Sequence, residues 1–136
     1  MTEVWMMRVF SAKLEVAVAS RDWVEAQRCA TQAVEVWREG FRKRPDAHHK
    51  QLLAAGLPNL GECSGYAGGY EEACQYLGLG LRTLYELVER EGHVLGPEHL
   101  MIMVEEGEDA LRFFQSMRAE QLHPKYVPFV TTEIDP

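Results

Sequence analysis

The spacing of apolar residues predicts that this chain is helical along most of its length. Apolar side chains recur at intervals of three and four positions, which places them on one face of an α-helix, and no alternating pattern typical of a strand occurs before residue 124. In the clearest amphipathic stretch, from Trp23 to Phe41, the apolar positions step by 3, 4, 3, 4 and 4 residues. We therefore expect an all-α fold of about five antiparallel helices, over residues 3–19, 23–41, 46–66, 70–91 and 97–121.

Proline and glycine refine these boundaries. Pro58 lies inside the third stretch and lacks a backbone N–H, so we expect a kink or a split of that helix near Gly56. Residues 92–96 begin and end with glycine and are expected to form a loop. Pro97 follows this loop and suits the first turn of the last helix.

The end of the chain differs from the rest. Residues 122–136 contain three prolines and are not expected to form a helix. Their centre, residues 126–130, is too apolar for a solvated tail. We therefore expect one helical domain over residues 1–121 and an extended tail over 122–136, which docks either on the chain's own helices or on a second copy in a homodimer.

The composition is that of a small globular domain. The chain has 136 residues, 46% of them hydrophobic, and a net charge of −7 at pH 7. Such acidity disfavours general nucleic-acid binding, because phosphate contacts dominate that affinity, and no apolar run approaches the ~20 residues of a membrane span. The three cysteines lack CxxC spacing, which favours reduced thiols over a disulfide framework or a zinc site. We expect a cytoplasmic protein that binds neither nucleic acid nor membrane.

The charge is unevenly distributed along the chain. Residues 1–50 contain nine basic and seven acidic side chains, whereas residues 51–136 contain five basic and fourteen acidic ones. Such asymmetry can steer partners, although a solvated helix end explains it as well. The basic residues concentrate around the end of the second predicted helix. We call them the basic cluster: Arg38, Arg42, Lys43, Arg44 and Lys50.

Two segments resemble each other and a known helical repeat. WVEA at residues 23–26 and YEEA at residues 70–73 both place an aromatic residue three positions before an alanine. Together with NLG at residues 59–61, the second segment resembles the tetratricopeptide repeat, well over residues 57–85 and loosely over residues 7–37. The copies lie 47 residues apart, against about 34 in the standard repeat, and this spacing resembles the long-helix variety of kinesin light chains. A plain antiparallel bundle with an alanine-rich seam is the alternative.

The resemblance implies a binding function. In tetratricopeptide repeats, the first helix of each pair lines a concave face that binds peptides or partner helices. Two pairs would give only a shallow groove here, with the fifth helix as a cap. The resemblance thus implies a non-catalytic adaptor or chaperone-like module with a protein or peptide partner and no cofactor. The positions expected to contact the partner are Arg8, Ser11, Glu15, Glu62 and Tyr66.

An enzymatic alternative depends on four carboxylates. Glu86 and Glu89, separated by sixteen residues from Glu106 and Asp109, resemble the ExxE…ExxD pattern of the all-α NTP pyrophosphatases, in which such groups hold Mg²⁺. With the helix ends expected above, however, the second pair lies roughly 10 Å along its helix from the point opposite the first pair. The five histidines show no metal-ligand spacing. Catalysis is therefore the weaker of the two hypotheses.

Overall fold

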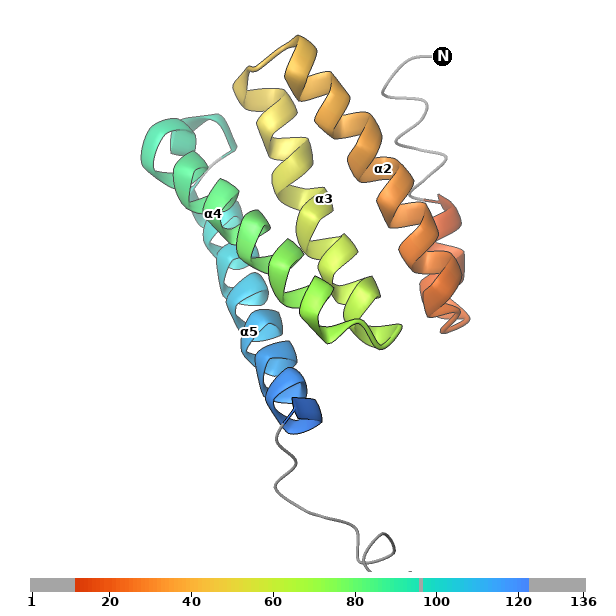
Figure 1. The fold of residues 1–136 in the computed structure, drawn as a ribbon. Coiled ribbons are helices and arrows are strands. Elements are labelled where there is room, and N and C mark those ends of the chain that lie inside the picture. The colour runs from red at the N-terminus through yellow and green to blue at the C-terminus, as the bar shows by residue number, and fades with distance from the viewer. Residues whose placement is uncertain (1–11, 96, 123–136) are drawn as a thin grey trace, which may run out of the picture.

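The described part of the chain is almost entirely helical. The computed structural model describes residues 12–95 and 97–122, and it shows no strand among them. A helical segment over residues 12–19 precedes four long helices (Figure 1). The all-α prediction is therefore confirmed. The long helices are α2 (Trp23–Lys43), α3 (Ala47–Tyr66), α4 (Tyr70–Leu95) and α5 (Pro97–Leu122).

Short polar side chains fix where two of these helices begin. The carboxylate of Asp22 accepts a hydrogen bond from the backbone N–H of Glu25 at 3.2 Å, and that of Asp46 accepts one from the N–H of His49 at 2.9 Å. Each bond satisfies an N–H group that the first turn of a helix leaves unpaired. Between α3 and α4 the backbone turns at Gly68, whose φ of +102° suits a residue without a side chain.

Helix α3 lies at the centre of the fold. It packs between α2 and α4, while α5 packs mainly on α4 and also touches α3. Among the described helices, α2 and α4 make no contact with each other, so the helices form a row rather than a closed four-helix bundle (Figure 1). Residues 12–19 join the core between α2 and α3 through Leu14 and Ala17. One face of α3 consequently lies between residues 12–19 and α5.

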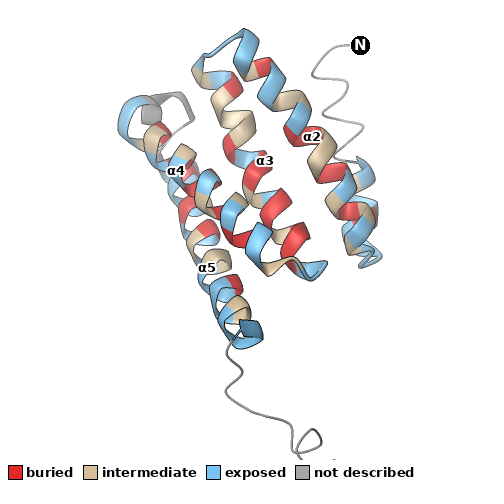
Figure 2. Cartoon of the chain, viewed as in Figure 1, coloured by how far each residue is buried: buried red, intermediate tan, exposed pale blue. Residues whose placement is uncertain are grey.

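Burial follows the predicted apolar stripes. The stripe on α2 consists mostly of small side chains, whereas the stripe on α4 is rich in leucine. Small residues allow two helices to approach closely, and leucines fill wider spaces between them. The buried apolar residues are Ala26, Cys29, Ala30, Ala33 and Val34 on α2 and Ala73, Cys74, Leu77, Leu81, Leu84 and Leu87 on α4 (Figure 2).

Of the kink or split that Pro58 led us to expect near Gly56, the split is wrong, because α3 runs as one helix from Ala47 to Tyr66, and the kink stays a prediction. The proline ring packs where Gly80 of α4 has no side chain: a Cβ on Gly80 would lie only 2.8 Å from Cδ of Pro58. Helix α3 is packed against α2 and α4. This tertiary packing maintains the helix despite the N–H group that proline lacks.

The loop expected over residues 92–96 is also wrong, because α4 continues to Leu95 and α5 begins at Pro97. A glycine such as Gly92 costs about 1 kcal/mol inside a helix, which does not stop a helix that is already propagating. The proline is the effective stop, because the residue before a proline is disfavoured in helical backbone. The connection between α4 and α5 is therefore one residue long.

Two expectations fall outside the described residues. They are the beginning of the first helix and the docking of the tail that we expect over residues 122–136, of which only Leu122 is described, at the end of α5. No helix in the described ranges has the length and apolar character needed to cross a bilayer.

Candidate functional site

Two of the five predicted contact residues lie on the open face of α3. Glu62 is half-buried and Tyr66 is half-exposed, and both border hollows in the surface. Glu15 is exposed on the first helical segment but lines neither of these hollows. Arg8 and Ser11 lie outside the described residues. The structure therefore brings together the part of the predicted surface that belongs to α3.

The first hollow lies between residues 12–19, the start of α2 and α3, and encloses ≈ 180 Å³. We call it the aromatic hollow, because the rings of Trp23 and Tyr66 border it, stacked with centroids 4.7 Å apart. Tyr66 also meets Phe114 of α5 edge to face at 5.3 Å, so aromatic contacts hold α3 on both sides. Among the described residues, its lining is Leu14, Val18, Trp23, Asn59, Glu62, Cys63 and Tyr66.

The second hollow lies between α3 and α5 and encloses ≈ 270 Å³. We call it the acidic hollow, because Glu62 of α3 and Glu106 of α5 both line it. Burial raises the pKa of the Glu62 carboxyl, and the charge of Glu106 raises it further. Within the described ranges, no hydrogen bond or ion pair engages either carboxylate. The lining residues that the structure describes are Ala55, Pro58, Asn59, Glu62, His99, Met103, Glu106 and Gly107.

Asn59 and Glu62 line both hollows, which therefore form one continuous surface across α3. The two residues lie three positions apart and are neighbours on the helix surface. Together with Ala55 and Tyr66 they follow a spacing of four, three and four residues, which places all four on one face of the helix. We call this surface the α3 groove.

Sequence reasoning missed most of the residues that line the α3 groove, among them Asn59, His99 and Met103. Asn59 figured only in the repeat-like string, although it shares the helical spacing of Glu62 and Tyr66 and so carried a usable signal. His99 and Met103 come from α5. Their place beside α3 depends on how α5 crosses it, and the spacing of residues along the chain does not give that crossing.

The four carboxylates of the enzymatic alternative do not assemble. Glu86 of α4 forms an ion pair with Lys50 of α3 at 2.7 Å. Glu106 of α5 instead lies beside Glu62, which also belongs to α3. Lys50 and Glu62 are twelve residues apart, or roughly 18 Å along α3. Asp109 pairs with Arg112, and Glu89 is exposed. Among the described residues, no group of three or more potential ligands could hold a metal ion.

Much of the basic cluster is paired within the chain. Arg42 and Lys43 contact Glu39 at 2.6 and 3.8 Å, and Lys50 contacts Glu86 as described above. Surface ion pairs of this kind contribute little to stability, but they reduce the positive field that the cluster could offer a partner. This pairing favours a solvated helix end as the interpretation of the cluster.

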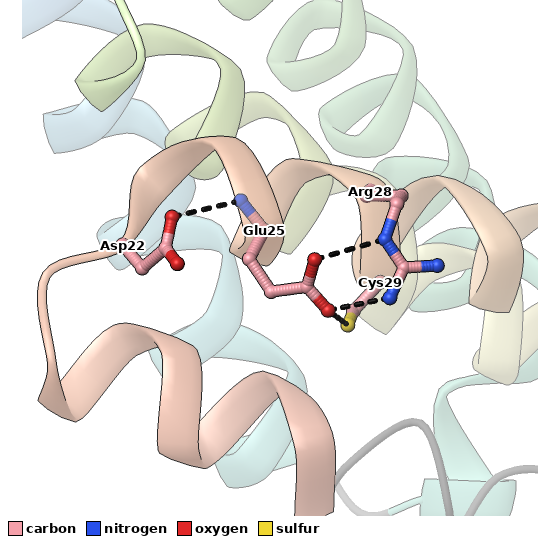
Figure 3. A network of polar contacts seen from close by, with 4 residues as sticks. All are labelled: Asp22, Glu25, Arg28 and Cys29. Carbon is pink, nitrogen blue, oxygen red and sulfur yellow. Dashed lines mark hydrogen bonds and ion pairs between the residues drawn. The ribbon is translucent and has the colours of Figure 1, made fainter.

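A further hollow of ≈ 420 Å³ lies between residues 12–20 and the start of α2, and none of its described lining residues belongs to the α3 groove. Two carboxylates in the described part of the chain border it, and both are engaged in local structure (Figure 3). Asp22 caps α2, as described above. Glu25 accepts hydrogen bonds from Arg28 Nε at 2.9 Å and from the thiol of Cys29 at 3.5 Å. These carboxylates are thus committed to the fold.

The three cysteines are unsuited to nucleophilic chemistry. Cys29, Cys63 and Cys74 are all buried and unpaired. Burial is the main cause that raises the pKa of each thiol, and it brings the pKa of Cys63 to about 11. Because the thiolate is the nucleophile, thiols with raised pKa values are unreactive near neutral pH. The cysteines act as small apolar core residues, as their positions on apolar faces predict.

Comparison with known proteins gives no assignment, since no family model, curated protein or solved structure matches this chain. The function of the α3 groove is therefore inferred from its own geometry.

Proposed function

We propose that this chain is a non-catalytic protein-interaction module, an adaptor or chaperone-like protein that binds a peptide or partner helix in the α3 groove. The observation that carries the proposal is the junction of the two hollows at Asn59 and Glu62. A groove with an apolar part and a polar part suits a chain segment, because apolar anchors supply affinity and polar contacts fix the register of the segment.

The resemblance to tetratricopeptide repeats supports this proposal. In that family, the first helix of each pair lines the binding face. The corresponding elements of this chain are the helix that ends at residue 19 and α3. Both border the α3 groove, and α5 borders it on the other side.

The cysteines support a cytoplasmic location. All three thiols are free and none is placed in a disulfide. Free thiols persist in a reducing compartment, whereas oxidising compartments favour disulfides. We therefore place the protein and its partner in the cytoplasm.

Site-specific photo-crosslinking in the source cells tests the proposal. Benzoylphenylalanine is introduced at Asn59, which is exposed and borders both hollows. The control carries the same group at Gln75, which is exposed on α4 and lines neither hollow. We expect a crosslinked product with another protein at Asn59 and little or none at Gln75.

The possible products separate the proposal from its competitors. Mass spectrometry of the product at Asn59 should place the crosslink in one segment of one partner. Equal crosslinking at both positions, or none at either, would contradict a specific groove. A product that contains two copies of this chain and nothing else would indicate a homodimer interface in place of an adaptor surface.

A further inference from the structure

We infer that the α3 groove selects a cationic partner segment, in which a lysine or arginine side chain enters the acidic hollow and a neighbouring large apolar side chain enters the aromatic hollow. This inference rests on the proposed function and adds the chemistry of the bound segment. Three features of the groove lead to it: its unbalanced charge, its apolar walls and the size of its hollows.

The acidic hollow carries negative charge without a lysine or arginine to balance it. Glu62 and Glu106 come from different helices, and the only other ionisable side chain in the described lining is His99. A half-buried carboxylate without a hydrogen-bond partner is unfavourable, and a second carboxylate nearby makes it more so. An ammonium or guanidinium group from a partner would remove both penalties by donating a charge-assisted hydrogen bond.

The walls of the acidic hollow suit the stem of a basic side chain. Ala55 and Pro58 of α3 and Met103 of α5 line the hollow beside the carboxylates. Lysine and arginine pack their methylene groups on apolar surface while the charged end reaches polar groups. A hydrated metal ion has no such stem and would leave these walls without contact.

Each hollow taken singly is of a size that suits one side chain. The two hollows enclose ≈ 180 and ≈ 270 Å³, whereas small-molecule sites usually enclose about 300–1,000 Å³. Asn59 and Glu62 border both hollows and lie one helical turn apart. The basic and the apolar side chain that enter the hollows must therefore be close neighbours in the partner, about three or four positions apart if its segment is helical.

Peptide selection on the full chain tests the inference. A display library of random short peptides is selected on the wild-type protein, and the affinities of synthetic copies are measured by fluorescence polarisation. The test variant is Glu62→Gln/Glu106→Gln. The matched control is Glu35→Gln/Glu105→Gln, which removes the same number of charges at exposed positions on α2 and α5 that line neither hollow. Circular dichroism and thermal unfolding establish that each variant is folded.

The inference expects two results. The selected peptides should be enriched in lysine or arginine beside a large apolar residue. Their affinity should fall about tenfold for Glu62→Gln/Glu106→Gln, the loss expected when one charge-assisted hydrogen bond is removed, and should change little for the control.

Other outcomes overturn the inference, and they distinguish it from the proposed function. Equal losses in both double variants would indicate long-range attraction and contradict recognition in the acidic hollow. A second outcome would be peptides without basic residues that bind the wild type and both double variants alike but bind Val18→Ser, in the aromatic hollow, less tightly. That result would overturn the cationic preference and leave the proposed function standing. A library that yields no binder would contradict both.

Discussion

The ring of Phe114 on α5 occupies the space that a side chain at Gly65 of α3 would fill. Phe114 is only 1% exposed, and Tyr66 and Tyr70 also contact its ring, with centroids at 5.3 and 6.3 Å. Helix α5 packs mainly on α4 and touches α3 much less. The contact of Phe114 with Gly65 is one of the direct links between α5 and α3. It helps to fix how α5 borders the α3 groove.

Gly65→Ala should therefore destabilise the fold. The added Cβ would overlap the ring of Phe114, so the ring or the whole of α5 must shift, and overpacking of this kind costs about 1–3 kcal/mol. Gly78→Ala is the matched control, because no atom of another helix lies within 4 Å of a Cβ at that helical position. There the alanine should stabilise the protein by roughly 0.5–1 kcal/mol. Urea unfolding followed by circular dichroism measures the free energy of unfolding of both variants. Equal changes in the two would contradict the close contact at Gly65.

The positions of the helices could be predicted from apolar spacing, because each helix buries one face. The two wrong expectations about helix breaks have different causes, namely the tertiary contacts of Pro58 and the weakness of a glycine as a helix breaker. Pro58 is accommodated because Gly80 of the next helix leaves space for its ring, and that register is not visible in the sequence. Gly92 is too weak a breaker on its own, whereas Pro97 limits the helix effectively.

The candidate site was predictable only in part. Glu62 and Tyr66 follow from the repeat resemblance, which identifies the open face of α3. The spacing of the carboxylates includes Glu106 in the metal site of the weaker, enzymatic hypothesis, whereas the structure places it in the acidic hollow with Glu62. Spacing along a chain determines which residues share a face of one helix, but it does not determine which face of the next helix lies opposite.

Native thiols should react slowly with alkylating reagents. Cys63 is buried and its thiol has a pKa of about 11, for which burial is the main cause and the charge of Glu62 the next. Iodoacetamide near neutral pH should therefore modify Cys63 far more slowly in the native protein than in urea, where the pKa returns toward about 8.5. Peptide mapping by mass spectrometry measures the rate, which should increase as the pH is raised toward 11. Rapid native alkylation would be inconsistent with a buried, protonated thiol.

Removal of the cap at Asp46 should lower the thermal stability. The backbone N–H and then the ring of His49 donate to this carboxylate and lower its pKa below the ordinary value of 3.8. The ionised form thus stabilises the folded state above pH 3.8, and this stabilisation is lost as the pH falls through the lowered pKa. Asp46→Ala should lower Tm at neutral pH, whereas Asp46→Asn keeps an N-cap acceptor and should lower it less.

Thermal melts at neutral and acidic pH test both substitutions at this cap. The difference in Tm between the wild type and Asp46→Ala should become smaller in acid, because the wild-type carboxylate is then protonated. An Asp46→Ala variant as stable as the wild type at neutral pH would show that the cap does not support α3.

Glu62→Gln should stabilise the free protein while it weakens binding of cationic peptides. Burial, and then the charge of Glu106, raises the pKa of Glu62 above 4.5, so the folded state binds the proton more tightly than the unfolded state does. Stability is therefore lost as the pH rises from 4.5 through the raised pKa. Glutamine has no charge to bury and avoids this loss. The Tm of Glu62→Gln should therefore exceed that of the wild type, most at neutral pH and less as the pH falls toward 4.5.

Thermal melts of Glu62→Gln and of the exposed control Glu105→Gln, recorded as a function of pH, test this combination. The control should show no comparable increase in Tm. Replacing a side chain that serves only the fold lowers the stability of the protein. A variant that is more stable but binds peptide less tightly therefore identifies a carboxylate whose role is binding. A Glu62→Gln protein that is less stable than the wild type at neutral pH would mean that Glu62 supports the packing of α3 against α5, and its unfavourable burial would then have no role in binding.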